Sequence, residues 1–145
     1  MYLLDTNVIS EIRKARAGKA DRNVAAWAAA VAVADLFVSV IAIQEIEIGV
    51  LLAERRDPRQ GRLLRAWLDV HVLGAFADRI LPVDLSVARR SARLHVPTTR
   101  PVRDALIAAT ALIHGMMVVT RNVDDFSPTG VPIINPWEGA AAIPT

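Results

Sequence analysis

Cysteine is absent from the 145-residue chain. Its absence excludes a disulfide framework and every metal site built on thiolates, and it fits a reducing compartment, so we expect the protein in the cytoplasm. The first residues also lack the pattern of a secretory signal, because Asp5 and Glu11 interrupt them. A chain of this length is expected to form one domain with its own core.

A long uninterrupted hydrophobic run is also missing, although 53% of the residues are hydrophobic. The best candidate for a membrane span, residues 24–43, is rich in alanine and carries Asp35 in its middle. An acidic residue at that depth costs roughly 2.5 to 3.5 kcal/mol. We therefore expect a helix, a turn at Asp35 and a strand, with no membrane association. The surplus apolar surface is expected to contact another protein chain.

Neither sign of charge dominates, since 17 basic residues face 15 acidic ones and the formal net charge is +2. The sequence pI of about 9.7 reflects basic groups that are mostly arginine. The planar guanidinium group suits phosphate recognition because it donates two hydrogen bonds at once. A solvated arginine-rich surface would give the same composition, so charge alone does not select a partner.

Short apolar runs alternate along the chain with longer helical patterns. Strands are predicted at residues 2–4, 36–40, 79–84, 116–120 and 131–135. Helices are predicted after Thr6 and over residues 21–34, 41–56, 58–76, 85–95 and 102–115. Residues 41–48 partly alternate, which leaves a strand open there, but the length and the charged ending favour a helix. The order predicts an α/β fold, a single domain whose parallel sheet is flanked by helices on both faces.

Four acidic residues follow or precede the predicted strands where the ligand site of such a sheet lies, beyond the carboxyl ends of the strands. Asp5 follows the first strand, and Glu45 lies in the opening turns of the helix after the second. Asp104 lies in the first turn of the helix at residues 102–115, and Asp125 lies just beyond the next strand. All four are expected at one edge of the sheet.

Each carboxylate taken singly also has an ordinary structural explanation. Asp5 could start a helix, and Asp104 could complement the positive end of its helix. Glu45 has Glu47 beside it on a surface that could simply be solvated, and Asp125 competes with Asp124 in a turn. The joint arrangement is what points to function.

Four carboxylates brought together repel one another, at roughly 4 kcal/mol for a pair 4 Å apart at an effective dielectric of 20. A divalent cation relieves this repulsion, and a ligand set made only of oxygen atoms favours Mg²⁺ or Mn²⁺. The histidines, His71, His95 and His114, share no spacing typical of zinc ligands. The expected cofactor is therefore a hard cation.

The ordered motifs "LLDTN", "IQEIEIGV", "RDALIAATALIHG", "VVTRNVDDF" and "VPIINPWEG" resemble those of the PIN-domain ribonucleases, in particular the VapC-type toxins of bacterial toxin–antitoxin pairs. The resemblance implies a PIN domain over residues 1–139 and a C-terminal tail over residues 140–145. It places the family's acidic quartet, catalytic and metal-binding, on Asp5, Glu45, Asp104 and Asp125. Asp125 is preferred to Asp124 because it directly precedes Phe126 in the family's Asn-x-x-Asp-Phe pattern.

The same resemblance places supporting polar residues at Thr6, Asn7, Thr120 and Asn122. One position departs from the family, which often has Ser or Thr three residues before the glutamate, where this chain has Ala42. The departure removes a capping box and with it one marker for the start of that helix.

The resemblance implies metal-assisted hydrolysis of RNA that leaves 5′-phosphate and 3′-hydroxyl ends. It also implies a homodimer and a cognate VapB-like antitoxin. Four arginines beside the motifs are candidates for RNA binding: Arg13, Arg100, Arg103 and Arg121. Two other functions compete with this one, a catalytically inactive PIN module that binds RNA or protein, and a phosphatase that uses Asp5 as a nucleophile. The phosphatase lacks the second aspartate that one common pattern wants at Asn7.

Overall fold

The computed structural model of the chain describes the backbone of residues 1–142 and the side chains of residues 1–139. Five parallel strands form one sheet in the order β3–β2–β1–β4–β5. The strands are β1 (Tyr2–Leu4), β2 (Leu36–Ser39), β3 (Ile80–Leu81), β4 (Met117–Val119) and β5 (Ile133–Ile134). The predicted α/β fold with a parallel sheet is confirmed. Of the predicted tail, residues 143–145 lie outside the described residues.

Successive residues of the central strands point to opposite faces of the sheet, which creates two cores. Leu3 and Val118 belong to one buried cluster, whereas Leu4 and Val119 belong to the other. Strand β1 pairs with β2 through Tyr2 and Leu36 and with β4 through Leu4 and Val119. Because both faces of β1 are buried, helices must cover the sheet on both sides.

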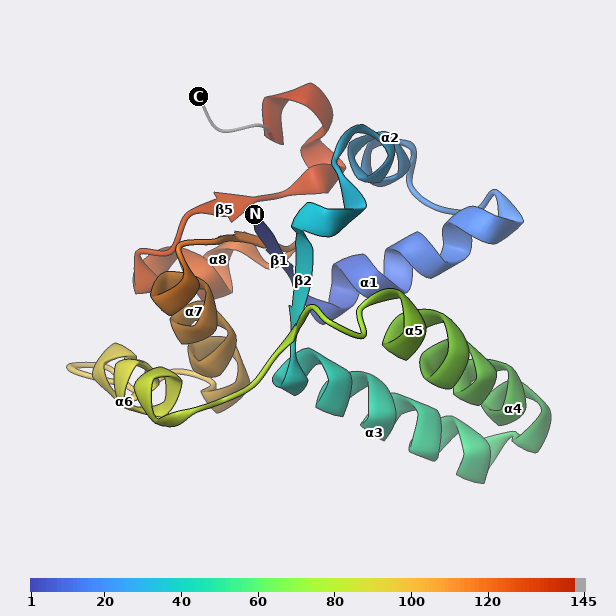
Figure 1. Cartoon of the computed structure of the whole chain (residues 1–145), viewed down its shortest axis with the longest axis horizontal. Helices are drawn as coiled ribbons and strands as arrows, with labels where there is room; N and C mark the ends of the chain where they lie inside the picture. The colour runs from blue at the N-terminus through green and yellow to red at the C-terminus, as the bar shows by residue number, and fades with distance from the viewer. Residues whose placement is uncertain (143–145) are drawn as a thin grey trace.

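One face is covered by the helices that precede β3 in the chain. They are α1 (Thr6–Arg13), η1 (Lys14–Ala17), α2 (Arg22–Ala30), η2 (Val33–Asp35), α3 (Val40–Arg56), α4 (Pro58–Ala66), η3 (Trp67–Val72) and α5 (Leu73–Ala75). The buried core on this face contains Leu4 together with Ile9, Trp27, Ile46 and Leu68. Figure 1 shows these helices to the right of the strands, with α3 and α4 side by side.

The other face is covered mainly by helices from the second half of the chain, to the left in Figure 1. They are α6 (Leu85–Leu94), α7 (Val102–His114), α8 (Val123–Phe126) and η4 (Ser127–Thr129), and η5 (Pro136–Ala142) closes the described chain against α2. Residues 105 and 107–111 of α7 are all buried, as predicted for a helix enclosed on two sides. Gly115 ends α7 in the left-handed conformation (φ 66°), which glycine adopts without a steric cost.

The predicted helix over residues 21–34 is too long, because α2 ends at Ala30. Val31 is extended and η2 makes a separate turn before β2. The Arg79 guanidinium donates to the carbonyl oxygens of Val33 (2.8 Å) and Leu36 (2.6 Å), which holds this turn against the end of α5. Among the described residues, no helix has both the length and the apolar character needed to cross a membrane.

Helix α3 begins earlier than the family comparison of Ala42 suggested. Ser39 caps it by accepting a hydrogen bond from the Ile41 amide (3.0 Å), and Val40 is its first residue. Ala42 is fully buried inside the first turn, so its missing hydroxyl is not needed for the cap. The same helix replaces the strand left open for residues 41–48.

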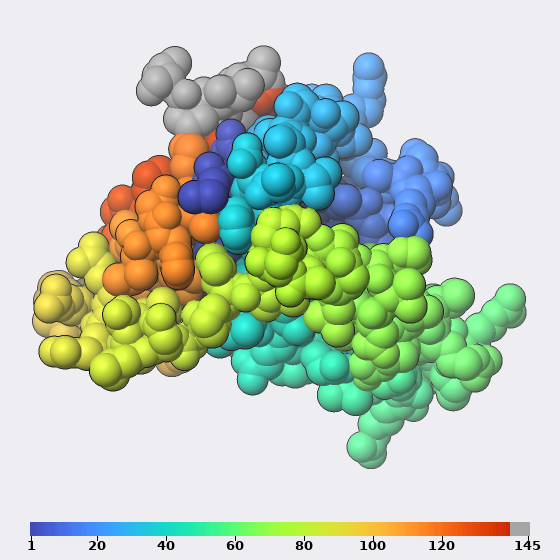
Figure 2. Space-filling model, in the orientation of Figure 1, coloured from blue at the N-terminus to red at the C-terminus, as the bar shows by residue number. Residues whose placement is uncertain are grey.

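The predicted amphipathic helix over residues 58–76 is continuous but changes pitch, since α4 passes into the π-helical segment η3 and then into α5. Its apolar residues at helical spacing predict a buried stripe. Leu68 and Val72 are buried as this pattern predicts, whereas Leu63, in the first part of the same pattern, is 59% exposed. Helices α3 and α4 form a hairpin that projects from the body of the molecule (Figure 2).

Candidate active site

Asp5 lies at the carboxyl end of the central strand, where β1 passes into α1. Its backbone N–H donates to the Val119 carbonyl (2.9 Å), which continues the pairing of β1 with β4. Its Oδ1 accepts from the Thr6 amide (2.8 Å) and caps α1. Its Oδ2 accepts from the Thr120 hydroxyl (2.8 Å) and the Asn7 amide group (3.3 Å). The side chain is therefore fixed as well as buried, with 5% exposure.

The supporting polar residues form one network that joins the ends of β1 and β4. The fully buried Thr120 hydroxyl accepts from the Asn122 amide (2.9 Å) while it donates to Asp5. The Asn7 side-chain Oδ1 accepts from the Arg121 backbone amide (3.3 Å). Four of the predicted residues, Thr6, Asn7, Thr120 and Asn122, thus lie together around Asp5 or one another.

The other three predicted carboxylates lie close enough to interact electrostatically with this centre. Burial chiefly raises the pKa of Asp5 above its ordinary value, the hydrogen bonds of Thr120 and Thr6 oppose this rise, and the charge of Asp125 adds to it. Burial also raises the pKa of Glu45 and of Asp104, and the charge of Asp5 raises both further. The quartet therefore converges from four elements, β1, α3, α7 and α8.

Asp125 belongs to this acidic rim because its charge raises the pKa of both Asp5 and Asp104. The Asp125 backbone amide donates to the Asn122 backbone carbonyl (3.2 Å), which fixes the start of α8. Asp125 also borders a hollow of about 500 Å³ lined by Arg121, Asn122, Val123, Asp124, Asn135 and Glu138.

The oxygen atoms at this rim suit a hard cation. In the described part of the chain, no three carboxylate or imidazole groups are drawn together tightly enough to form a ready-made cage. One buried oxygen nevertheless lacks a partner there, the Thr6 hydroxyl. It lies beside Glu45 and favours the ionised carboxylate, but outside normal hydrogen-bond geometry. Four carboxylates, a free buried hydroxyl and no nitrogen or sulfur donor match the oxygen preference of Mg²⁺ or Mn²⁺.

The four arginines proposed for RNA binding occupy different surroundings. The charge of Arg103, in the first turn of α7, lowers the pKa of Glu45, which places this arginine at the rim. Arg121 stacks over Trp137 at 5.1 Å and borders the hollow beside Asp125. Trp137 was not singled out from the sequence, and the residues around it do not predict that Arg121 stacks on its ring.

Arg13 and Arg100 make contacts with residues outside the acidic quartet. Arg13 lies at the end of α1 away from Asp5, with its guanidinium 5.6 Å from the centre of the Trp67 ring. Arg100 donates from Nε to the Leu94 carbonyl and from its amide to His95 Nδ1 (3.3 Å). Its side chain therefore holds the loop between α6 and α7.

A parallel sheet in the order β3–β2–β1–β4–β5, with an acidic rim at the carboxyl end of its central strand, defines the class of this protein. The model of the PIN domain matches residues 2–130, and the chain belongs to the PIN-domain family.

Close relatives match along nearly the whole chain. VapC ribonuclease Y4jK from Sinorhizobium fredii is 41% identical over 145 residues, which cover 97% of this chain and 100% of that protein. Toxin FitB from Neisseria gonorrhoeae is 35% identical over 143 residues, 94% of this chain and 99% of FitB. The crystal structure of FitAcB from Neisseria gonorrhoeae superposes with a TM-score of 0.84 at 34% identity, over 94% of this chain and 99% of the matched one.

Proposed function

We propose that the protein is a ribonuclease that hydrolyses phosphodiester bonds in RNA with Mg²⁺ or Mn²⁺, and that it is the toxin of a toxin–antitoxin pair. The observation that carries this proposal is the convergence of Asp5, Glu45, Asp104 and Asp125 at one rim of a PIN domain. The name and the 41% identity of the VapC ribonuclease from Sinorhizobium fredii support the same activity.

Asp5 and Asp104 would be the principal ligands of the cation, with Glu45 and Asp125 completing the site directly or through water. When bound, such an ion lowers the pKa of a coordinated water and offsets charge on the phosphoryl oxygens. The oxygen donors and the partnerless Thr6 hydroxyl support this assignment.

The residues around Asp5 hold it in one orientation, since Thr6, Asn7 and Thr120 all donate to its carboxylate. Glu45 is half-buried and its pKa is raised by burial and by Asp5, so it is suited to accept the proton of the attacking water. Arg103, whose positive charge lowers the pKa of Glu45, would hold the phosphate of the substrate against the acidic rim.

The two alternative functions receive less support. One common phosphatase pattern has a second aspartate where this chain has Asn7, and the Asn7 side chain donates a hydrogen bond to Asp5 (3.3 Å) instead of supplying a second carboxylate. A module that only binds RNA would gain nothing from four negative charges facing a polyanion. Neither alternative explains why the carboxylates come together.

We also propose a cognate VapB-like antitoxin, a homodimer and a cytoplasmic location. The antitoxin follows from the family resemblance. The exposed apolar side chains of α3, Ile48, Leu51 and Leu52, offer surface for another chain. The absence of cysteine suits a reducing compartment.

The test compares cleavage of structured RNA by the native protein and by Asp5→Asn, Asp104→Asn and Asp125→Asn, each with and without Mn²⁺. Each substitution is expected to lower the cleavage rate by at least about 100-fold, because each removes a negative ligand. Asp124→Asn is the matched control, since it removes a neighbouring charge outside the quartet, and it is expected to keep the native rate.

RNA cleavage by the native protein that persists in excess EDTA would contradict the proposed dependence on a metal ion. Hydrolysis of p-nitrophenyl phosphate without cleavage of RNA would select the phosphatase instead. Loss of RNA cleavage in Asp124→Asn but not in Asp125→Asn would show that the fourth carboxylate is assigned to the wrong residue.

A further inference from the structure

Three arginines cluster on α6, outside every motif that carries the proposed active site. Arg89, Arg90 and Arg93 line a hollow of about 340 Å³ together with Leu85, Ser86 and Ile113. At about 100° per residue, the three arginines lie within about 100° of the helix circumference. The opposite side of α6 buries Val87 and Ser91 against the body of the protein. The arginines therefore share one outward face, here called the α6 arginine face.

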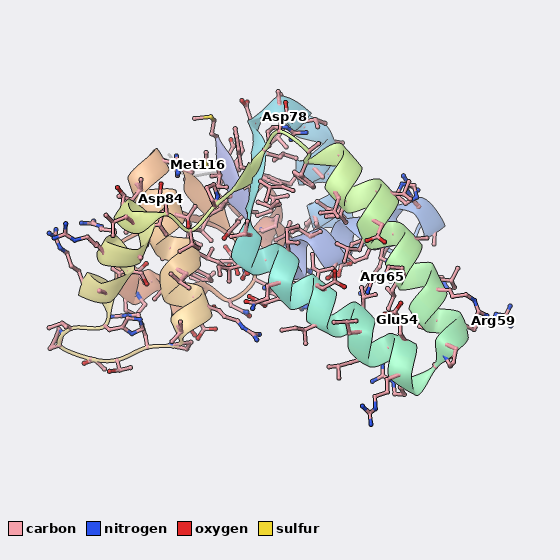
Figure 3. The ribbon with its side chains drawn as sticks, turned by 60° about the horizontal axis from the view of Figure 1, so that its bottom comes forward. Glu54, Arg59, Arg65, Asp78, Asp84 and Met116 are labelled. Carbon is pink, nitrogen blue, oxygen red and sulfur yellow. The ribbon has the colours of Figure 1, made fainter. Side chains whose placement is uncertain are left out.

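The charges of this face are not neutralised within the protein. Among the described side chains, none of the three guanidinium groups lies within 4.0 Å of a carboxylate. Asp84, at the start of α6, uses its carboxylate to accept from the Val87 amide (2.9 Å). In Figure 3, α6 runs from Asp84 along the outer side of α7, with nitrogen-tipped side chains projecting away from the body.

The position of α6 relates this face to the acidic rim. The hollow joins Leu85, at the start of α6, with Ile113, near the end of α7, so the two helices are antiparallel. Asp104 lies nine residues before Ile113 on α7, which corresponds to about 13 Å along the helix. Nine residues also make about two and a half turns, so the two side chains lie on opposite sides of α7. A nucleic acid strand that advances about 3.4 Å per nucleotide must therefore pass around the helix, and it would reach the hollow more than about four nucleotides from the cleaved bond.

We propose that the α6 arginine face binds the phosphate backbone of the RNA substrate away from the cleaved bond. This inference rests on the proposed ribonuclease function. Three unneutralised guanidinium groups on adjacent turns suit successive phosphates, which each accept two hydrogen bonds from an arginine fork. Contacts to phosphates carry no sequence information, so this face would bind RNA independently of its sequence. It would favour long RNA over short RNA without choosing the cleavage site.

The test measures RNA binding and RNA cleavage for native protein and for the triple variant Arg89→Ala/Arg90→Ala/Arg93→Ala. Binding is measured by fluorescence anisotropy in EDTA, with RNAs of about four and about 16 nucleotides. For the long RNA, the slope of log affinity against log salt is expected to fall by about 2 in the variant, since each lost phosphate contact removes about 0.7. The advantage of native protein over the variant should then shrink roughly 20-fold between about 50 and 200 mM salt.

Three comparisons make the result specific. Arg55→Ala/Arg59→Ala/Arg62→Ala removes the same charge from exposed residues of the α3–α4 hairpin, where Arg59 points into solvent (Figure 3), and should keep the native slope. The triple lysine variant of α6 keeps its charge and should retain most of the slope. Cleavage of the short RNA in Mn²⁺ should be the same for native protein and the α6 alanine variant. Circular dichroism confirms that each variant is folded.

An unchanged salt slope in the α6 alanine variant, or an equal loss in the hairpin variant, would overturn the inference. A change in oligomeric state of the α6 variant with unaltered RNA binding would assign the face to a protein partner instead. If the native protein cleaves no RNA but binds it with a larger salt slope than the α6 alanine variant, the RNA-binding face is supported and the proposed ribonuclease activity is refuted.

Discussion

Asp5 shows how one residue can serve structure and chemistry together. The sequence offered two explanations for it, the start of a helix and a ligand at the sheet edge. The structure gives it the first role, because Oδ1 caps α1, and positions it for the second, because its charge acts on Glu45 and Asp104. The two explanations are therefore compatible.

Removing Asp104 or Asp5 is expected to change the stability of the metal-free protein in opposite directions. Asp104→Asn removes a charge that is disfavoured by burial and by repulsion from Asp5 and Asp125, and we expect an increase of about 1 kcal/mol, or about 3 °C in Tm. Asp5→Ala removes the α1 cap and leaves the buried Thr120 hydroxyl without its acceptor, which costs about 2 to 4 kcal/mol. Thermal unfolding in EDTA measures both. A lower Tm for Asp104→Asn would mean that this carboxylate stabilises the fold.

Single residues were predicted well where the neighbouring sequence decides their position and poorly where a distant partner does. The positions of the four carboxylates relative to the strands could be predicted, because the apolar runs of those strands are clear in the sequence. Arg13 and Arg100 were chosen for their nearness to motifs, and the sequence did not predict that Arg13 lies over Trp67 or that Arg100 binds the backbone of Leu94. The α6 arginine face was missed because it lies outside the motifs, although the spacing of "RRSAR" places its arginines on one side of a helix.

At the scale of elements, the α3–α4 hairpin depends on close backbone contact. Asp57 caps α4 by accepting from the Arg59 and Gln60 amides. Glu54 and Arg65 point toward each other across the hairpin, with an ion pair at 3.1 Å (Figure 3). Gly61 makes this approach feasible, because a Cβ there would lie 2.4 Å from the Glu54 Cα.

Gly61→Ala is expected to destabilise the protein by about 1 to 3 kcal/mol, because the added methyl group meets backbone that cannot move aside. Gly49→Ala is the matched control, since Gly49 lies in α3 and a Cβ there meets nothing within 4 Å. That control should stabilise the protein by up to about 1 kcal/mol. Urea unfolding compares the two. Equal effects of the two substitutions would show that the hairpin is not closely packed at Gly61.

The elements that the sequence predicted least well are those whose ends are set by tertiary contacts. Helix α2 stops at Ala30 because Val31 turns toward β2, where Arg79 binds the backbone of the turn. The helix predicted over residues 41–56 is confirmed, although the alternating isoleucines of residues 41–48 had left a strand open; in α3, Ile46 is buried and Ile48 is exposed. Periodicity alone could not decide this, whereas the length of the segment could.

At the scale of the whole molecule, two sets of acids respond to pH in opposite ways. In the first set, Asp5, Glu45 and Asp104, burial and mutual repulsion raise the pKa of each group. The folded state then binds protons more readily than the unfolded one. The ionised groups therefore lower the free energy of unfolding by their full amount above the raised pKa values, and they no longer lower it below the ordinary values of 3.8 and 4.5. Hydrogen bonds lower the pKa of Glu11 and of Glu54, whose stabilisation is lost as pH falls below 4.5.

The metal-free protein is therefore expected to become more stable as pH falls from neutral toward the ordinary value of 4.5, and to lose the stabilisation from Glu11 and Glu54 below it. Saturating Mg²⁺ should stabilise the ionised rim by about 2.7 kcal/mol at a concentration 100 times its Kd, and so remove or reverse the rise. Tm measured against pH, in EDTA and in Mg²⁺, tests both statements, and Asp104→Asn should flatten the EDTA curve. A Tm in EDTA that rises toward neutral pH and is unmoved by Mg²⁺ would refute a repulsive, cation-binding rim, because the predicted slope comes from burying negative charges and holding them together without a counter-ion.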